Sequence, residues 1–442
     1  MQPMFSTLGK RSISWPTLIF AGVCIGAIGS KGAAADEENP IYDSDPRHLW
    51  NRLHEALFIR TAPDGKKYGI DRLDPLFWAN TKHLLAEPSH RQALAILDEF
   101  LEARGERLIR NPLKRAWLQH DLWFLFDWFA SPNRGEEFRR ERQELQRRIA
   151  IAIRRLALRR DEIASLPDNY ASAETNKLLT TLPRGLSQGE GEWVCVGADN
   201  SSPMAPEHVS AFGGRSLFHV MLRLPEGRRA VISYLDRLRS FERPWVYINQ
   251  LGLEAWSLNP QLPQFPTNTQ WALVRRMCVI DAEGRVQPTS IMESIQVRSY
   301  VQIPPGINPA IARTASPFER AQQFSEFVMS RRQNGMLRAV AKGEKDFLFV
   351  QLHSNGVDPF EYVPPEEQTR SRGNDLQSNV LQSCSNCHMA SGIHSVLTYN
   401  TSVRRPPELE VLGPERETVA TIQWKRRQFD WELLQGFWNH AD

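Results

Sequence analysis

The spacing of apolar residues changes near residue 190, and this change constrains the fold more than any other feature. From Asp45 to about Ser165, apolar residues recur at the three- and four-residue intervals of amphipathic helices. A stretch from about Pro167 to Glu192, rich in Pro, Gly, Ser, Thr and Asn, interrupts this pattern, and short strand-like runs follow it. The sequence therefore predicts an α+β protein with separate helical and β-rich sections.

Three helices are predicted in the first section from residues that favour helix starts. Asp45 precedes a proline, Ser89 and Gln92 are spaced as a capping box, and Asn111 precedes another proline. The third of these helices carries large apolar residues on nearly all sides between residues 117 and 129. We expect it to be the central helix of a helical domain, with its aromatic residues packed in an ordinary core.

Residues 136–160 predict an amphipathic helix with a basic face. Its apolar stripe is formed by Leu145, Ile149, Ile153 and Leu156, and nine arginines surround it. Such a face could dock an acidic redox partner. Nearby glutamates favour the simpler interpretation, which is a solvated face with local ion pairs.

The section from residue 190 to residue 305 is predicted to be β-rich and antiparallel. One hairpin is expected from residues 218–222 and 230–234, and another from residues 271–280 and 290–303, each around a turn that contains glycine. Residues 245–248 predict a further strand between them.

The remaining chain predicts a mostly helical C-terminal section. Ser316 and Glu319 form a capping-box pattern with proline at the first helical position, and a helix carrying Phe324, Phe327 and Val328 is expected to follow. Residues 415–438 predict a final helix. The expected organisation is a signal peptide (1–35), a helical domain (36–166), a linker (167–189), a β-rich domain (190–305) and a C-terminal helical section (306–442).

The N-terminus has the pattern of a secretory signal peptide. Lys10 and Arg11 precede an apolar run over residues 13–28, and Ala33 and Ala35 supply a cleavage site of the A-x-A type. An uncleaved membrane anchor is the alternative, but the run is short of the roughly 20 apolar residues that span a bilayer. No later segment is long and apolar enough, so we expect an exported, periplasmic protein without an integral span.

The charge balance gives no reason to expect a polyanionic partner. The full chain has 54 basic and 51 acidic residues, and residues 1–35 hold three basic residues and no acidic one. Removal of that segment leaves 51 of each sign, so the mature chain is formally neutral. A neutral chain lacks the overall basic charge typical of proteins that bind nucleic acid.

Four of the five cysteines remain after export. Cys195 and Cys278 fall in the β-rich section, where they either form a disulfide or stay as two buried thiols. The other two belong to Cys384-Ser385-Asn386-Cys387-His388, a CxxCH element. Two thiols at this spacing can each add to one vinyl group of a porphyrin, and the adjacent histidine then lies over the iron.

At this element the chain resembles c-type cytochromes. The resemblance covers five residues, and it implies one covalent haem c with thioether links to Cys384 and Cys387. It also implies that His388 is the proximal iron ligand, and that the protein transfers electrons to or from a redox partner protein.

The second axial ligand is not given by the element itself. A histidine in the Gly- and Pro-rich loop before it, His353, is the candidate we favour, while Met329 and Met336 are others. A five-coordinate iron is the alternative, and it would suit a haem enzyme of peroxidase type.

Two further interpretations use the same cysteines. Cys384, Cys387, His388 and His394 supply four ligands of the kinds that bind structural zinc. The cysteine pair could instead form a disulfide. In either case the protein would be an exported scaffold or binding protein without a redox function.

Overall fold

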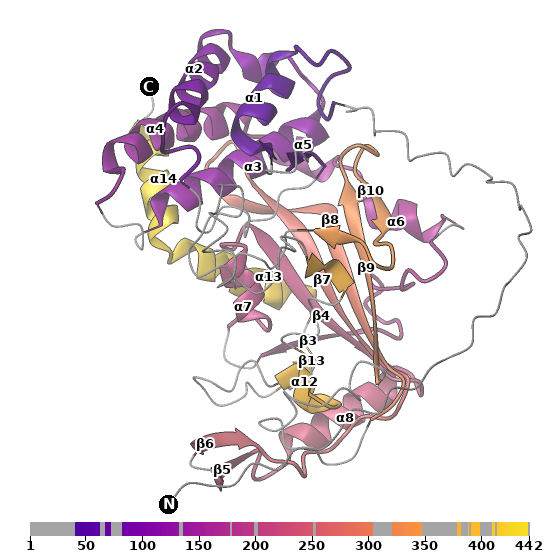
Figure 1. Ribbon diagram of the computed structural model, residues 1–442. Helices are drawn as coiled ribbons and strands as arrows, with labels where there is room; N and C mark the ends of the chain where they lie inside the picture. Colours follow the sequence, from indigo (N-terminus) through magenta and orange to yellow (C-terminus); the bar gives the residue numbers. More distant parts are fainter. Residues whose placement is uncertain are drawn as a thin grey trace, which may run out of the picture. The chain divides into compact units, whose positions relative to one another are not determined.

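The computed structural model describes thirteen segments of the chain, and residues 40–442 form one compact unit. The described residues are 40–61, 67–71, 82–131, 136–176, 179–198, 202–250, 253–303, 321–346, 378–381, 388, 390–397, 409–411 and 413–440. The protein is α+β, as predicted, with helices and one large antiparallel sheet (Figure 1). The predicted signal peptide lies outside the described residues, and the predicted domain boundaries stay predictions.

The helices gather mainly before and after the sheet in the sequence. They are α1 (Leu49–Phe58), α2 (Ser89–Glu102), η2 (Gly105–Arg107, a 3-10 turn), α3 (Pro112–Ala130), α4 (Arg139–Leu156), α5 (Arg160–Ala164), α6 (Asn169–Glu174), α7 (Pro206–Ala211), α8 (Arg228–Arg239), α12 (Ile393–Leu397), α13 (Pro414–Arg426) and α14 (Phe429–His440).

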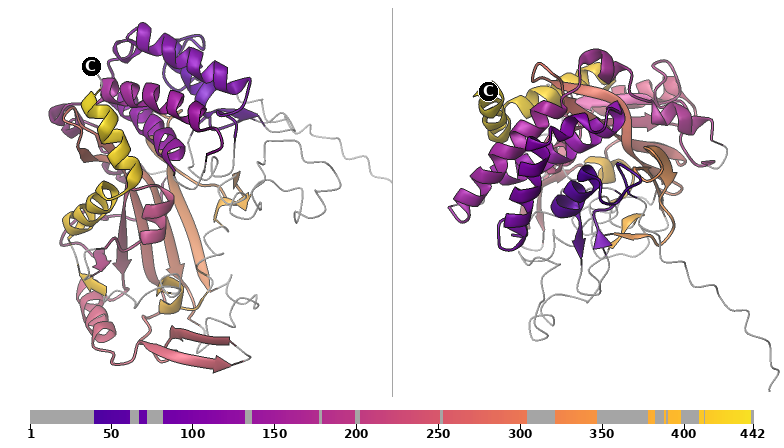
Figure 2. Two further views of the ribbon diagram at one scale, coloured as in Figure 1. Left: turned by 90° about the vertical axis from the view of Figure 1, so that its left-hand side faces the viewer. Right: turned by 90° about the horizontal axis from the view of Figure 1, so that it is seen from above.

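The helix predicted to be central is α3, and it is buried along nearly its whole length. The Asn111 side chain caps it by accepting hydrogen bonds from the backbone N–H groups of Leu113 (2.9 Å) and Lys114 (3.2 Å). Helices α4 and α14 pack against α3, and the views in Figure 2 show α14 running beside these two helices. The apolar run of α3 is therefore ordinary core, as predicted.

The basic helix is α4, and its apolar stripe is buried as predicted. Several of its arginines are held by carboxylates. Arg148 forms two hydrogen bonds with Asp98 (2.7 and 3.1 Å), and Arg140 contacts Glu144 at 3.0 Å. These pairs favour the interpretation of a solvated face.

One predicted helix start and one predicted cap differ from the structure. Helix α1 begins at Leu49, where His48 Nδ1 accepts from the Trp50 N–H (3.2 Å), rather than at Asp45. Helix α2 begins at Ser89, but no capping box forms there, because the Ser89 hydroxyl donates to backbone carbonyls that precede the helix.

One seven-stranded sheet forms the centre of the fold, with strand order β10-β9-β8-β7-β4-β3-β13 and antiparallel pairing throughout. The described residues also form three two-stranded pairs: β1 with β2, β5 with β6, and β11 with β12. The strands are β1 (Arg60–Thr61), β2 (Lys67–Tyr68), β3 (Val194–Ala198), β4 (Ser216–Arg223), β5 (Trp245–Gln250), β6 (Leu253–Leu258), β7 (Thr269–Ile280), β8 (Val286–Tyr300), β9 (Gln322–Ser330), β10 (Met336–Ala339), β11 (Lys345–Asp346), β12 (Ser378–Asn379) and β13 (Leu409–Val411).

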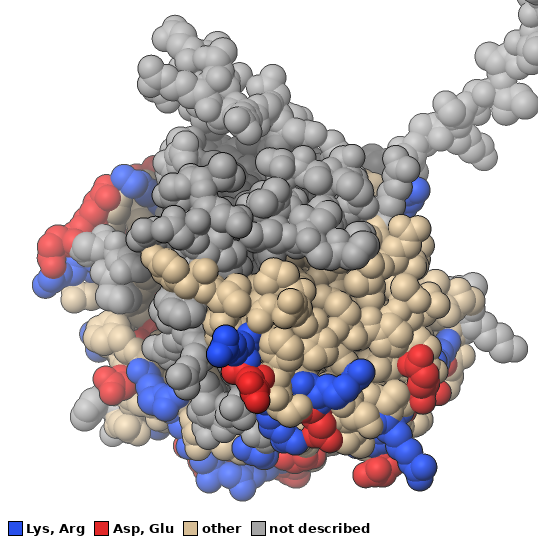
Figure 3. Space-filling view, turned by 90° about the horizontal axis from the view of Figure 1, so that it is seen from below, with Lys and Arg blue, Asp and Glu red and all other residues tan. Residues whose placement is uncertain are grey.

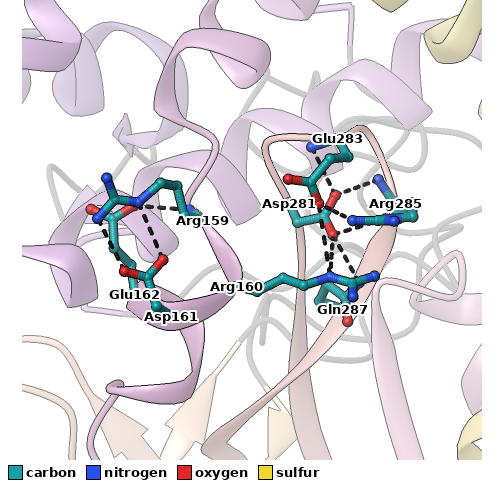
Figure 4. A network of polar contacts seen from close by, with 8 residues as sticks. All are labelled: Arg159, Arg160, Asp161, Glu162, Asp281, Glu283, Arg285 and Gln287. Atoms are coloured by element: carbon teal, nitrogen blue, oxygen red, sulfur yellow. Dashed lines mark hydrogen bonds and ion pairs between the residues drawn. The ribbon is translucent and has the colours of Figure 1, made fainter.

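The predicted hairpin over residues 271–303 is confirmed as β7 and β8, and its turn is organised by Asp281 (Figure 4). This buried carboxylate accepts from the backbone N–H groups of Glu283 (3.0 Å) and Arg285 (2.9 Å) and from the Gln287 side chain (2.8 Å). Arg160 of α5 reaches the same carboxylate at 3.4 Å. The turn thereby attaches the longest strands of the sheet to the helices (Figures 1 and 4).

The predicted hairpin with residues 230–234 as a strand is wrong, because that segment belongs to helix α8. Gly227 has a φ of 83° and ends the extended chain after β4. In the helix, Val231, Tyr234 and Leu235 are buried while Ile232 is 37% exposed. This is the spacing of an amphipathic helix, and a five-residue window is too short to reveal it.

The helix predicted after Ser316 is also wrong, since residues 322–330 form strand β9 between β8 and β10. Phe327, Val328 and Met329 are consecutive and all buried. A strand covered on both faces has such an uninterrupted apolar run, which period alone does not distinguish from a buried helix. The predicted final helix is present as two, α13 and α14, which are separated at residues 427–428.

The two faces of the sheet are covered by different elements. Leu217, Val274 and Ile295 point into the core shared with α1 to α6 and α14. Leu222, Trp271 and Tyr300 point into a second core that includes residues of α8 and α12. The second face is the one that receives the segment around His388.

Cys195 and Cys278 lie on different strands of this sheet and are unpaired within the described part of the chain. Burial is the main cause that raises the pKa of each thiol, to about 12 for Cys195. The alternative of two buried thiols is therefore confirmed over a disulfide.

Charged residues of both signs are mixed on the surface shown in Figure 3. Ion pairs such as Arg223 with Glu192 (2.7 Å) and Arg239 with Asp236 (2.5 Å) occur on the exposed parts of β4 and α8. Among the described residues, no helix is both long enough and apolar enough to cross a bilayer.

Candidate functional site

The CxxCH element is represented in the described structure by its histidine. Cys384, Cys387 and the candidate ligand His353 lie outside the described residues. His388 and the segment 390–397, which includes α12, are described and define the surroundings of the element.

The imidazole of His388 is oriented by one short hydrogen bond. Its Nδ1 lies 2.7 Å from the backbone carbonyl oxygen of Ser395. A carbonyl can only accept, so Nδ1 carries the proton, and the neutral ring has its lone pair on Nε2. Metal-bound histidines commonly donate their other ring N–H to a backbone carbonyl in this way.

Burial lowers the pKa of His388 well below its usual value, and the charge of Arg298 acts in the same direction. The ring is therefore neutral at pH 7. Because the ring is neutral and its proton is on Nδ1, Nε2 has the free lone pair that binds a transition metal.

A residue of β9, Gln322, binds the backbone at His388 and at Ala390. The Gln322 side chain donates to the carbonyl oxygens of His388 (3.1 Å) and Ala390 (3.0 Å). Gln322 is buried, so its amide satisfies two backbone acceptors that would otherwise be covered without a partner.

Residues 392–394 are held by a loop that follows β6. Gln264 accepts from the Ile393 N–H (2.9 Å), and its amide nitrogen lies 3.2 Å from His394 Nδ1. Gly392 has a φ of 54°, and a Cβ there would lie 2.1 Å from Gln264 Oε1, so a larger residue would strain the backbone and displace the Gln264 side chain.

His394 uses both ring nitrogens in this arrangement. Nδ1 accepts from the Gln264 amide, and Nε2 donates to the Asn259 carbonyl oxygen at 3.1 Å. A histidine bound in this way has a structural role, which disfavours its use as a zinc ligand. The described residues also contain no group of three or more His, Cys, Asp or Glu side chains that could hold a metal ion.

Arg298 and Tyr300 of β8 complete the polar surroundings of His388. Arg298 Nη1 donates to the Ser395 carbonyl oxygen (3.3 Å), the same atom that accepts from His388. It also donates to the Tyr300 hydroxyl (3.1 Å), which in turn donates to Ser395 Oγ (2.5 Å). Sequence analysis missed these residues, because they precede the element by about 90 positions and carry no local pattern.

His208 of α7 is another residue that the sequence did not single out. Its ring packs on Phe218 of β4, with the centroids 5.5 Å apart. Burial lowers the pKa of His208 to about 4, and the charges of Arg298 and Arg275 contribute to this lowering. Both histidines are therefore neutral and influenced by the same arginine.

The two methionine candidates do not approach this segment. Met329 is buried in the core shared with the helices, on the opposite face of the sheet from Tyr300. Met336 of β10 is 48% exposed.

Comparisons of the chain with protein-family models, with curated proteins and with solved structures find no significant match. Any function assigned to this protein therefore depends on the CxxCH element and on the contacts of His388.

Proposed function

We propose that this protein carries one covalent haem c and transfers electrons after export to the periplasm. Cys384 and Cys387 would form the two thioether links, and His388 would be the proximal iron ligand. The observation that carries the proposal is the hydrogen bond from His388 Nδ1 to the Ser395 carbonyl, which leaves Nε2 as the basic nitrogen.

The bound haem would supply one-electron chemistry at its iron. The protein's own residues would hold and orient the group. Ser395 fixes the imidazole, Gln322 fixes the backbone around it, and burial keeps the ring neutral. A ligand that is preset in this way does not have to reorganise when the metal binds.

Electron transfer implies a redox partner protein and a filled second axial position, for which His353 remains the candidate. A haem enzyme of peroxidase type would instead keep that position open. Binding of carbon monoxide to the reduced protein separates the two cases, because carbon monoxide needs an open position. A zinc or disulfide scaffold would bind no haem at all.

The test is expression of the full chain in a bacterium that has haem-attachment machinery. The purified protein should stain for haem peroxidase activity after denaturing electrophoresis and give a pyridine haemochrome spectrum. The double substitution Cys384→Ser and Cys387→Ser should abolish both signals. Cys195→Ser is the matched control, since that thiol is unpaired and lies on β3, and it should retain them.

A wild-type protein that remains colourless under these conditions would refute the proposal. His388→Ala tests the ligand separately. It should leave the covalent stain in place while it changes the visible spectrum, because the thioether links do not involve the imidazole. An unchanged spectrum would contradict the assignment of His388.

A further inference from the structure

His120 of α3 is a buried histidine whose two ring nitrogens both face acceptor groups. Nδ1 lies 2.9 Å from the backbone carbonyl oxygen of Cys278 on β7, and Nε2 lies 3.3 Å from Oε1 of Glu293 on β8. His394 differs, because it accepts at one nitrogen and donates at the other, as a neutral ring can. A neutral ring has a single N–H, so it can satisfy only one of the two acceptors around His120.

Glu293 acts as an acceptor because its buried carboxyl group is ionised. Ser216 of β4 donates to Oε2 at 2.5 Å, and Arg275 Nε lies 3.7 Å from the same oxygen. Burial alone would raise the pKa of Glu293, but the charges of Arg275 and His120 and the hydrogen bonds from His120 and Ser216 lower it below its usual value. A carboxylate has no proton to donate, so the proton of this contact is on Nε2 and the ring is an imidazolium.

An irregularity of the β7–β8 hairpin brings Glu293 to the helix. Arg275 lies opposite Ser294 and Arg276 lies opposite Met292, so Glu293 is an additional residue on β8, as in a β-bulge. Bulges redirect a side chain at the point where the regular ladder is interrupted. The two N–H groups of the imidazole therefore attach α3 to both strands at the bulge.

The other charged groups around this pair are already engaged or belong to the same strands. The Cys278 thiol is neutral, because burial raises its pKa. The remaining charges are Arg275 and Arg276 on β7, Asp121 with its partner Arg331, and Asp127 with its partners Arg215 and Lys425.

We propose that this junction is a proton-dependent switch, in which the second ring proton of His120 holds α3 to Glu293 and its loss releases that contact. In the neutral ring, Nδ1–H still donates to the Cys278 carbonyl, while the lone pair of Nε2 faces the carboxylate. Histidines of an unfolded chain titrate at about pH 6.5, so above that pH the folded protein holds a proton that the unfolded chain has released. The stabilisation is therefore present in mild acid and is lost as the pH rises.

The first test is the number of protons on the His120 ring, measured by NMR on the full chain labelled with ring-¹⁵N histidine. The chain has 11 histidines, and His120→Gln identifies the signals of this one. At about pH 7.5 both ring nitrogens should be protonated in the wild type. Glu293→Gln should leave a proton on Nδ1 alone, because the new amide can donate to Nε2. Glu415→Gln, at an exposed position of α13, is the matched control and should retain both protons.

Two buried histidines serve as internal references. Burial lowers the pKa of His54 and of His219 to about 4, so both rings should carry one proton in every sample. A doubly protonated buried ring is thus recognised in the wild-type spectrum even if one of the variants does not fold.

The second test is urea unfolding of the wild type and Glu293→Gln as the pH is raised from mildly acidic to mildly alkaline. The wild type should lose stability relative to the variant, by at most roughly tenfold in the unfolding equilibrium constant per pH unit, as one proton allows. If Glu293→Gln does not fold, His120→Gln takes its place in this series.

Each result decides the proposal. A wild-type His120 ring with one proton at about pH 7.5 overturns it. A doubly protonated ring together with a pH-independent difference in stability overturns the switch and leaves a permanent ion pair. Neither measurement depends on a bound haem, so the outcome is independent of the proposed function.

Discussion

Glu417 of α13 provides a test of the fold through the pH dependence of stability. Its side chain is 1% exposed, and Oε1 accepts a hydrogen bond from the Met204 N–H at 2.7 Å. Burial raises the pKa of Glu417 from 4.5 to about 7, and the hydrogen bond offsets only part of this rise. The folded protein therefore binds a proton at this carboxyl group where the unfolded chain does not.

The sign and size follow from linkage between protonation and folding. A rise in pKa from 4.5 to about 7 corresponds to about 3 kcal/mol. Between these two pH values the folded state is protonated at Glu417 and the unfolded state is ionised. The contribution to the free energy of unfolding is thus fully present below pH 4.5 and is lost as the pH rises to about 7.

The perturbation is Glu417→Gln, which imitates the protonated side chain at every pH. The variant should match the wild type near pH 4.5 and exceed its free energy of unfolding by about 3 kcal/mol at pH 8. Urea unfolding followed by tryptophan fluorescence measures this across the pH range, and 13 tryptophans provide the signal.

Glu415→Gln is the matched control. Glu415 lies on the same helix, is exposed, and makes the same change in net charge when substituted. This control should show no pH-dependent difference from the wild type. If the free energies of unfolding of the wild type and of Glu417→Gln differ by a constant amount from pH 4.5 to pH 8, the raised pKa of a buried Glu417 is wrong.

Two further results are expected. If the protein carries the proposed haem with His353 as its second ligand, His353→Ala should allow carbon monoxide to bind the reduced protein, whereas His208→Ala should not; the opposite result would transfer the ligand role to His208. Asp121→Asn should lower the free energy of unfolding by roughly 3–5 kcal/mol, because it breaks a buried bidentate pair with Arg331. Asp161→Asn, in the exposed pair with Arg159, should give no measurable loss on urea unfolding, and equal losses in both variants would contradict this account.

The helices of the first section could be predicted because their determinants are local. The Asn111 cap and the apolar content of α3 lie within one segment, and the stripe of α4 extends over about three turns. The β7–β8 hairpin was equally accessible, since its turn and both strands are adjacent in the sequence.

Two predictions of secondary structure were wrong where a short apolar run is compatible with both a helix and a strand. Residues 322–330 are a strand because β8 offers a pairing partner about 30 positions earlier, with Ser294 opposite Val328 and Tyr300 opposite Gln322. Residues 230–234 are helical because only a longer window shows which side of the segment is buried. In both cases tertiary context overrides the local pattern.

The candidate site likewise combines features that are local in the sequence with contacts from distant segments. The CxxCH element and the role expected of His388 come from five adjacent residues, but the groups that set the state of His388 come from elsewhere in the chain. Gln322 and Arg298 reach it from β9 and β8, and Gln264 holds the helix that presents Ser395. If the proposed haem is bound, a change that disturbs the register between β8 and β9 should therefore alter its spectrum without touching the element, because it moves the donors that hold the backbone of His388 and the Ser395 carbonyl.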